Sequence, residues 1–144
     1  MKLLLDINVI VDVLTARRPW VEHSAAVLSL LDDARVEGFV AVHTITTIHY
    51  LLTEHLGRKK AAAALLDVLR LVRVVPVDHD MMLKALSLGW KDFEDAVQAV
   101  CALQVGADYV VSRNPGDFES FSIPVVSPSD LLALLGRGRE EPQG

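Results

Sequence analysis

Short apolar runs alternate with longer amphipathic stretches along the chain. The apolar runs predict buried strands, because a strand covered on both faces carries few polar positions. The longer stretches carry helix signals, such as the alanine-rich run at residues 61–64 and Gly57 after an amphipathic segment. The expected strands are residues 2–6, 39–43, 72–77, 109–112 and 124–126. The expected helices are residues 8–16, 21–37, 44–55, 58–71, 80–87, 92–105 and 129–135.

This alternation predicts an α/β fold with three layers, α/β/α, around a central and mostly parallel sheet. The length of 144 residues fits one domain, which we expect to span residues 1–135. Residues 136–144 are polar and contain glycine, so we expect a flexible C-terminal tail there. Gly38 is expected to close the helix over residues 21–37.

Composition excludes several classes of function. The net charge of −5 argues against a broad basic surface for nucleic acid, but not against a small acidic site that works through bound cations. A single cysteine, Cys101, excludes an internal disulfide and a cysteine-based zinc cluster, and it fits a reducing cytosol. No apolar run approaches the roughly 20 residues that span a bilayer. We therefore expect a soluble, cytoplasmic protein without membrane contacts.

Three acids stand where a parallel sheet usually carries its chemistry, beyond the C-terminal ends of strands. Asp6 ends the first expected strand, Asp95 lies in the first turn of the helix over 92–105, and Asp117 follows the strand over 109–112. Each alone also fits a turn or a cap, as Asp92 fits the N-cap of its helix. Carboxylates that converge repel each other, and a bound cation relieves that repulsion. Oxygen ligands favour Mg²⁺ or Mn²⁺ over zinc.

Three segments resemble the PIN-domain ribonuclease family. Leu4-Leu5-Asp6-Ile7-Asn8-Val9-Ile10 is similar to the family's opening strand motif, in which Asp, one variable residue and Asn precede apolar positions. Residues 92–99 resemble its late helix, and residues 106–118 resemble its closing strand and loop. The segments occur in the family's order, and the likeness extends over residues 1–135.

The resemblance implies a metal-dependent endoribonuclease that hydrolyses single-stranded RNA with Mg²⁺ or Mn²⁺. The family's catalytic metal ligands would correspond to Asp6, Asp95 and Asp117. Asn8 would hold Asp6 and the loop by hydrogen bonds, and Ser112 would orient a ligand or a phosphate. Two further supporting residues are Asp92, through water, and Asn114, which stands where many relatives have Asp.

The resemblance also implies partners, because small single-domain members are often the toxin of a toxin–antitoxin pair. We therefore expect a cognate antitoxin and a homodimer, with the apolar helix at residues 61–71 available to either interface. Arg17 and Arg18 follow the helix that begins at the Asp6 motif, and they are candidates for contact with RNA phosphates.

One departure from the family pattern bears on activity. Many PIN domains carry a Glu early in the helix after the second strand, where this chain reads Thr44-Ile45-Thr46-Thr47-Ile48-His49. The nearest acid, Glu54, lies about 10 Å further along the helix, so we expect weaker metal binding. The alternative is a catalytically weak or inactive PIN-like domain that binds nucleic acid or protein. A phosphatase-like or receiver-like domain fits less well, because Asn8 replaces a second Asp and Ser112-Arg113 supplies no Lys.

Overall fold

The computed structural model describes the backbone of residues 1–140 and the side chains of residues 1–136. Within this part of the chain, five parallel strands form one sheet in the order β3-β2-β1-β4-β5. The strands are β1 (Lys2–Leu5), β2 (Glu37–Ala41), β3 (Arg73–Val75), β4 (Tyr109–Val111) and β5 (Val125–Val126). The helices are α1 (Ile7–Leu14), α2 (Val21–Leu30), α3 (Val42–Leu56), α4 (Arg58–Leu71), α5 (His79–Ser87), α6 (Phe93–Val105), α7 (Pro128–Glu140) and the short 3₁₀ helix η1 (Pro115–Asp117).

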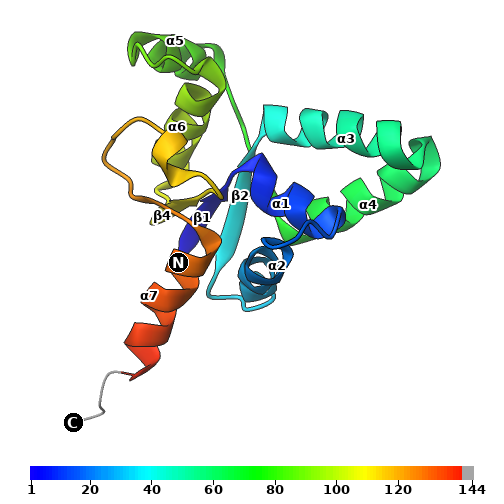
Figure 1. Ribbon diagram of the computed structural model, residues 1–144. Helices are drawn as coiled ribbons and strands as arrows, with labels where there is room; N and C mark the ends of the chain where they lie inside the picture. The colour runs from blue at the N-terminus through cyan, green and yellow to red at the C-terminus, as the bar shows by residue number, and fades with distance from the viewer. Residues whose placement is uncertain (141–144) are drawn as a thin grey trace.

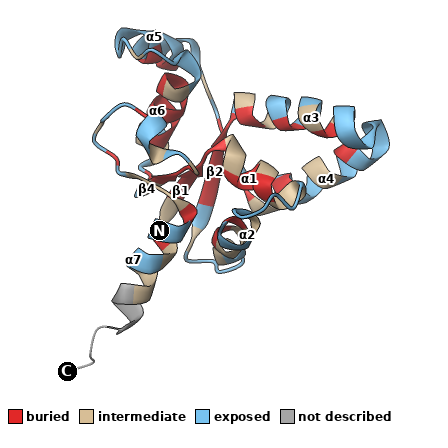
Figure 2. Cartoon of the chain, in the orientation of Figure 1, coloured by how far each residue is buried: buried red, intermediate tan, exposed pale blue. Residues whose placement is uncertain are grey.

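Helices cover both faces of the sheet, as the alternating sequence pattern predicts. Successive side chains of β1 point to opposite faces. Leu4 packs in a core with α5 and α6, whereas Leu3 and Leu5 pack in a second core with α1, α2, α3, α4 and α7. Figure 1 shows α5 and α6 on one side and the α3–α4 hairpin projecting on the other, and Figure 2 shows the buried strands between them. The expected three-layer α/β/α fold is confirmed.

The central strand β1 places the chemistry of the molecule. It pairs with β4 so that Leu5 lies opposite Val111. The backbone N–H of Asp6 continues this ladder by donating to the carbonyl oxygen of Val111 at 2.9 Å. The C-terminal ends of β1 and β4 therefore lie side by side, and they bring Asp6 next to Ser112.

Both ends of α6 follow local sequence signals, whereas the predicted end of the second helix is wrong. Asp92 caps α6 by accepting from the backbone N–H of Asp95, and Gly106 ends the same helix in the left-handed conformation. Gly38, however, does not close a helix over residues 21–37, because α2 ends at Leu30 and Gly38 lies inside β2. A Cβ atom at Gly38 would lie 2.7 Å from Cδ1 of Leu31. Glycine there permits a close approach of the segment after α2 to the sheet.

The C-terminal segment differs from the expected boundary. Helix α7 continues through Glu140, so residues 136–140 extend the last helix where the sequence predicted the start of a tail. A glycine within a helix costs only about 1 kcal/mol, which explains why Gly136 does not end α7. The rest of the expected tail, residues 141–144, lies outside the described residues. Among residues 1–140, no helix combines the length and the apolar composition needed to cross a membrane.

Candidate active site

An open cavity of about 1000 Å³ lies beyond the C-terminal ends of β1 and β4. Parts of the chain that are far apart in sequence meet around it: the turn after β1, the first turns of α3 and α6, and the loop around η1. Acids, amides and hydroxyls make up most of its polar lining. The lining residues are Asp6, Ile7, His43, Thr44, Thr47, Lys91, Asp92, Phe93, Glu94, Asp95, Gln98, Ser112, Asp117, Phe118 and Glu119.

Asp6 is the most firmly held acid of this cavity. It is buried at the N-cap of α1, and its Oδ1 accepts from the backbone N–H of Ile7 at 2.8 Å and from Nε2 of Gln98 at 3.1 Å. Its Oδ2 accepts from the hydroxyl of Ser112 at 2.8 Å and from Nδ2 of Asn8 at 3.2 Å. Four donors converge on one carboxylate, so its orientation is fixed.

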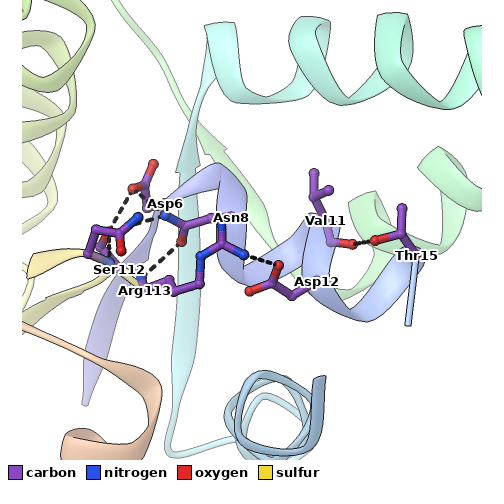
Figure 3. A network of polar contacts seen from close by, with 8 residues as sticks. Asp6, Asn8, Val11, Asp12, Thr15, Ser112 and Arg113 are labelled. Carbon is purple, nitrogen blue, oxygen red and sulfur yellow. Dashed lines mark hydrogen bonds and ion pairs between the residues drawn. The ribbon is translucent and has the colours of Figure 1, made fainter. Parts of the chain in front are cut away.

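Asn8 joins α1 to the segment that follows β4. Its Nδ2 lies 3.4 Å from the hydroxyl oxygen of Ser112, and its Oδ1 accepts from the backbone N–H of Arg113 at 3.0 Å. The Ser112 oxygen in turn accepts from the backbone N–H of Asn114 at 3.2 Å. Figure 3 shows these side chains gathered between the end of β1 and the loop after β4. The network ties the Asp6 carboxylate to two separate elements.

The first turn of α6 supplies a second group of acids. Burial and the nearby carboxylates of Asp92, Asp6, Asp117 and Glu94, in that order, raise the pKa of Asp95 to about 6. Several negative charges therefore converge on Asp95, as the sequence predicts for the ends of parallel strands. Such repulsion is the physical condition under which a bound cation is stabilising.

The donor chemistry of this cavity fits a hard divalent cation. Its acids offer carboxylate oxygens, and Oε1 of Gln98 is a buried oxygen without a hydrogen-bond partner among the described residues. Oxygen ligands of this kind suit Mg²⁺ and Mn²⁺. Within the part of the chain that the structure describes, no three acid, histidine or cysteine side chains are close enough to hold a metal ion as they stand. Ligands on different elements would have to move together to complete a coordination shell.

Comparison with known proteins assigns the family. The model of the PIN domain matches residues 2–115. The chain belongs to the PIN domain family. A curated relative, ribonuclease VapC1 of Aquifex aeolicus, is 28% identical over 135 residues, which cover 90% of this chain and 92% of that protein.

Solved structures share the PIN fold over most of this chain. VapBC2 of Rickettsia felis, solved bound to a DNA fragment from its promoter, aligns with a TM-score of 0.71 and 12% identity over 88% of this chain and 98% of that one. VapC20 of Mycobacterium tuberculosis, described as a sarcin-ricin loop cleaving toxin, aligns with a TM-score of 0.60 and 16% identity over 75% and 86% of the two chains. At these identities the likeness supports the fold.

The PIN motifs converge only in part on the cavity. Five of the residues expected in the site line it: Asp6, Asp92, Asp95, Ser112 and Asp117. Asn8 stands behind Asp6 and contacts it directly. Asn114 is exposed and is not among the lining residues, although its backbone N–H contacts Ser112. The individual roles of these side chains stay predictions.

Arg17 and Arg18 do not line this PIN cavity. Arg17 instead lines a separate, mainly apolar cavity of about 620 Å³ between α1 and α3. Its guanidinium carbon lies 5.9 Å from the ring centroid of Trp20. Outside this lining, either arginine could contact only other phosphates of a substrate that extends beyond the acidic cavity.

The place of the missing PIN glutamate is visible at the start of α3. His43, Thr44 and Thr47 line the cavity there, whereas Glu54 and His49 do not. The sequence interpretation missed two other acids of the lining, Glu94 and Glu119, together with Lys91 and Gln98. Gln98 could have been found, because it lies three residues after Asp95 on the same face of α6. Nothing in the local pattern shows where the loop carrying Glu119 folds.

Proposed function

We propose that this chain is a metal-dependent endoribonuclease that hydrolyses phosphodiester bonds of single-stranded RNA, and that it is the toxin of a toxin–antitoxin pair. The observation that carries the proposal is the convergence of carboxylates in an open cavity, where burial and these like charges raise the pKa of Asp95 to about 6. Membership of the PIN domain family and similarity to ribonuclease VapC1 support the reaction class.

Asp6, Asp95 and Asp117 are the proposed ligands of Mg²⁺ or Mn²⁺. When bound, the cation would supply Lewis acidity, which activates water and offsets the charge of the phosphodiester. Asn8 and Ser112 orient Asp6, since both donate to its Oδ2. Asp92 is already occupied by the backbone N–H of Asp95, so we assign it a water-mediated contact rather than direct ligation.

An extended, flexible substrate fits the open shape of this site. Single-stranded RNA can pass through an open cavity, whereas a duplex presents a wide rigid surface. Lys91 lies in the lining and supplies a positive charge for a phosphate. The net charge of −5 means that substrate binding depends on the cation more than on a basic surface.

The proposed protein partners are an antitoxin and a second copy of this chain. Solved neighbours include VapBC complexes from several bacteria, such as VapBC from Salmonella typhimurium bound to DNA. Helix α4 exposes Leu66 and Leu69, so the stretch at residues 61–71 has apolar surface available for an interface.

Cleavage of single-stranded RNA with Mg²⁺ or Mn²⁺ tests the mechanism. Asp6→Asn and Asp95→Asn should each abolish cleavage, while Asp67→Asn should not, because Asp67 is an exposed acid on α4 outside the cavity. Unchanged cleavage in both cavity variants would contradict the proposed mechanism. Calorimetric titration with Mn²⁺ tests the alternative, a PIN-like binding module without catalysis. That alternative is favoured if the wild type shows no binding at millimolar metal.

A further inference from the structure

A second buried acid lies on α1 and takes no part in the cavity. Asp12 is fully buried, and its Oδ1 accepts from Nη1 of Arg113 at 2.7 Å. Its Oδ2 is buried without a hydrogen-bond partner among the described residues. Neither Asp12 nor Arg113 is among the residues that line the cavity. A charged group held in this way needs a reason other than contact with substrate.

Arg113 is held twice by the same helix. Its backbone N–H donates to Oδ1 of Asn8, and its guanidinium donates to Asp12. Asn8 and Asp12 are four residues apart, so they lie one above the other on one face of α1. Figure 3 shows Arg113 reaching along α1 between these two contacts. The segment after β4 is therefore attached to α1 at two points, through the backbone and through the side chain of Arg113.

Trp20 makes a third contact with Arg113. The guanidinium carbon of Arg113 lies 4.2 Å from the centroid of the Trp20 ring, which is within the range of a cation–π contact. Only 17% of the Arg113 side chain is exposed. A planar guanidinium between an acid and an aromatic ring has little freedom to change rotamer.

Stability alone does not account for the pair. Burial raises the pKa of Asp12 even though the nearby charges of Arg113 and Arg17 lower it, so desolvation outweighs the attraction. Buried ion pairs commonly contribute little net stability, and fixing one geometry is a use that has been found for them. Here the geometry that the pair fixes is the path of the chain next to Ser112.

We infer that Asp12 and Arg113 are positioning residues, whose ion pair locks the segment after β4 against α1 so that Asn8 and Ser112 hold the Asp6 carboxylate toward the cavity. The inference rests on the proposed function, because the orientation of Asp6 matters for activity only if Asp6 binds the metal ion. The chain of contacts runs from Asp12 through Arg113 and Asn8 to Asp6.

The Asn8 side-chain amide gives a readout that needs neither metal nor RNA. In the wild type its two protons should give dispersed NMR signals with slow solvent exchange. Asp12→Asn should shift these signals and speed their exchange about tenfold, through local opening, at a temperature where the variant is folded. In calorimetry the same variant should bind Mn²⁺ about tenfold more weakly, as is typical when support behind a ligand is lost. Asp67→Asn, which breaks an exposed ion pair with Arg70, should change neither readout.

Arg113→Lys is the second variant. It keeps a cation beside Asp12 and so protects the fold, but it loses the planar group over Trp20. It should move both readouts in the same direction by a smaller factor. Asn8 signals and exchange that match the wild type in the folded variants would overturn the inference, even if Asp12→Asn lowers the unfolding temperature. If wild-type protein binds no Mn²⁺ while Asn8 responds as expected, the positioning contact stands and the proposed function fails.

Discussion

Asp6 and Asp95 face the same cavity, but the protein surrounds their carboxyl groups differently. Asp6, at the end of β1, accepts hydrogen bonds from Ile7, Asn8, Gln98 and Ser112. Asp95, in the first turn of α6, is only partly exposed, and burial together with nearby carboxylates raises its pKa to about 6. The Asp6 carboxylate is held by four donors, whereas the charged form of Asp95 is disfavoured by burial and by like charges.

This difference shows how an acidic cavity, which we propose as a cation site, can fold without a cation. On the β1 side, neutral donors from α1, from the segment after β4 and from Gln98 of α6 hold the Asp6 carboxylate in place without a cation. On the α6 side, the carboxylates around Asp95 repel one another, and a bound cation would reduce this repulsion. Removing the charge should therefore change stability with opposite sign on the two sides, although both changes should abolish cleavage.

Asp6→Asn should have the largest effect on stability. Its Oδ1 would still accept from Ile7 at the N-cap, where Asn and Asp are about equally good. Its new NH₂ group would face the donors of Asn8 and Ser112, and a buried donor without a partner costs about 1–3 kcal/mol. We expect a loss of about 3 kcal/mol in the free energy of unfolding, measured by denaturant titration in EDTA. If Asp6→Asn and Asp67→Asn had the same free energy of unfolding, the hydrogen bonds to Asp6 would not stabilise the fold as we expect.

Mn²⁺ should stabilise the protein more at pH 8 than at pH 5. At pH 5 a proton on Asp95 competes with the cation, because the pKa of this group is about 6. At a Mn²⁺ concentration of about 100 Kd the gain in unfolding free energy should be about 2.7 kcal/mol at pH 8. Thermal unfolding with and without Mn²⁺ at both pH values measures this difference. Equal gains at the two pH values would remove Asp95 from the proposed ligands.

Asp95→Asn should stabilise the metal-free protein at pH 8. The folded pKa of about 6 lies above the ordinary value of 3.8, so the folded state holds the proton more tightly and stability falls as pH rises between these values. The full shift corresponds to about 3 kcal/mol, which partial exposure reduces to about 1 kcal/mol. Unfolding in EDTA should show this gain at pH 8 and none below pH 4. If Asp95→Asn were less stable than the wild type at pH 8, the negative charge of Asp95 would not destabilise the metal-free protein.

Local signals predicted much of the fold. Asp92 and Gly106 mark the ends of α6 as expected, since caps act within one helical turn. Gly38 misled the helix prediction because a glycine also serves where another segment approaches the backbone closely. The course of residues 31–36 depends on that approach, which a periodicity argument does not contain.

The candidate site was predictable where topology alone decides. The sequence placed Asp6 and Ser112 at the C-terminal ends of parallel strands, whereas the pairing that makes these strands neighbours is seen only in the structure. The contact between Asp12 and Arg113 joins residues 101 positions apart, and neither residue type nor spacing signals it. Glu119 reaches the cavity through a loop whose path is set by packing. Side-chain direction in irregular segments is therefore the part that the sequence pattern did not supply.

Thr47→Glu adds an acid on the opposite side of the cavity from α6, and it should change Mn²⁺ binding less than the other variants do. Thr47 is exposed and lines the cavity at the start of α3, where many PIN domains carry a Glu, so a longer acid can enter without a core clash. An added carboxylate raises the ligand charge, and we expect Mn²⁺ affinity to rise about threefold in calorimetry. Thr46→Glu adds the same charge to the same helix outside the cavity, and it should leave the affinity unchanged. Equal affinities in the two variants would mean that metal binding is confined to acids from β1, α6 and η1, and that the absent glutamate does not limit this protein.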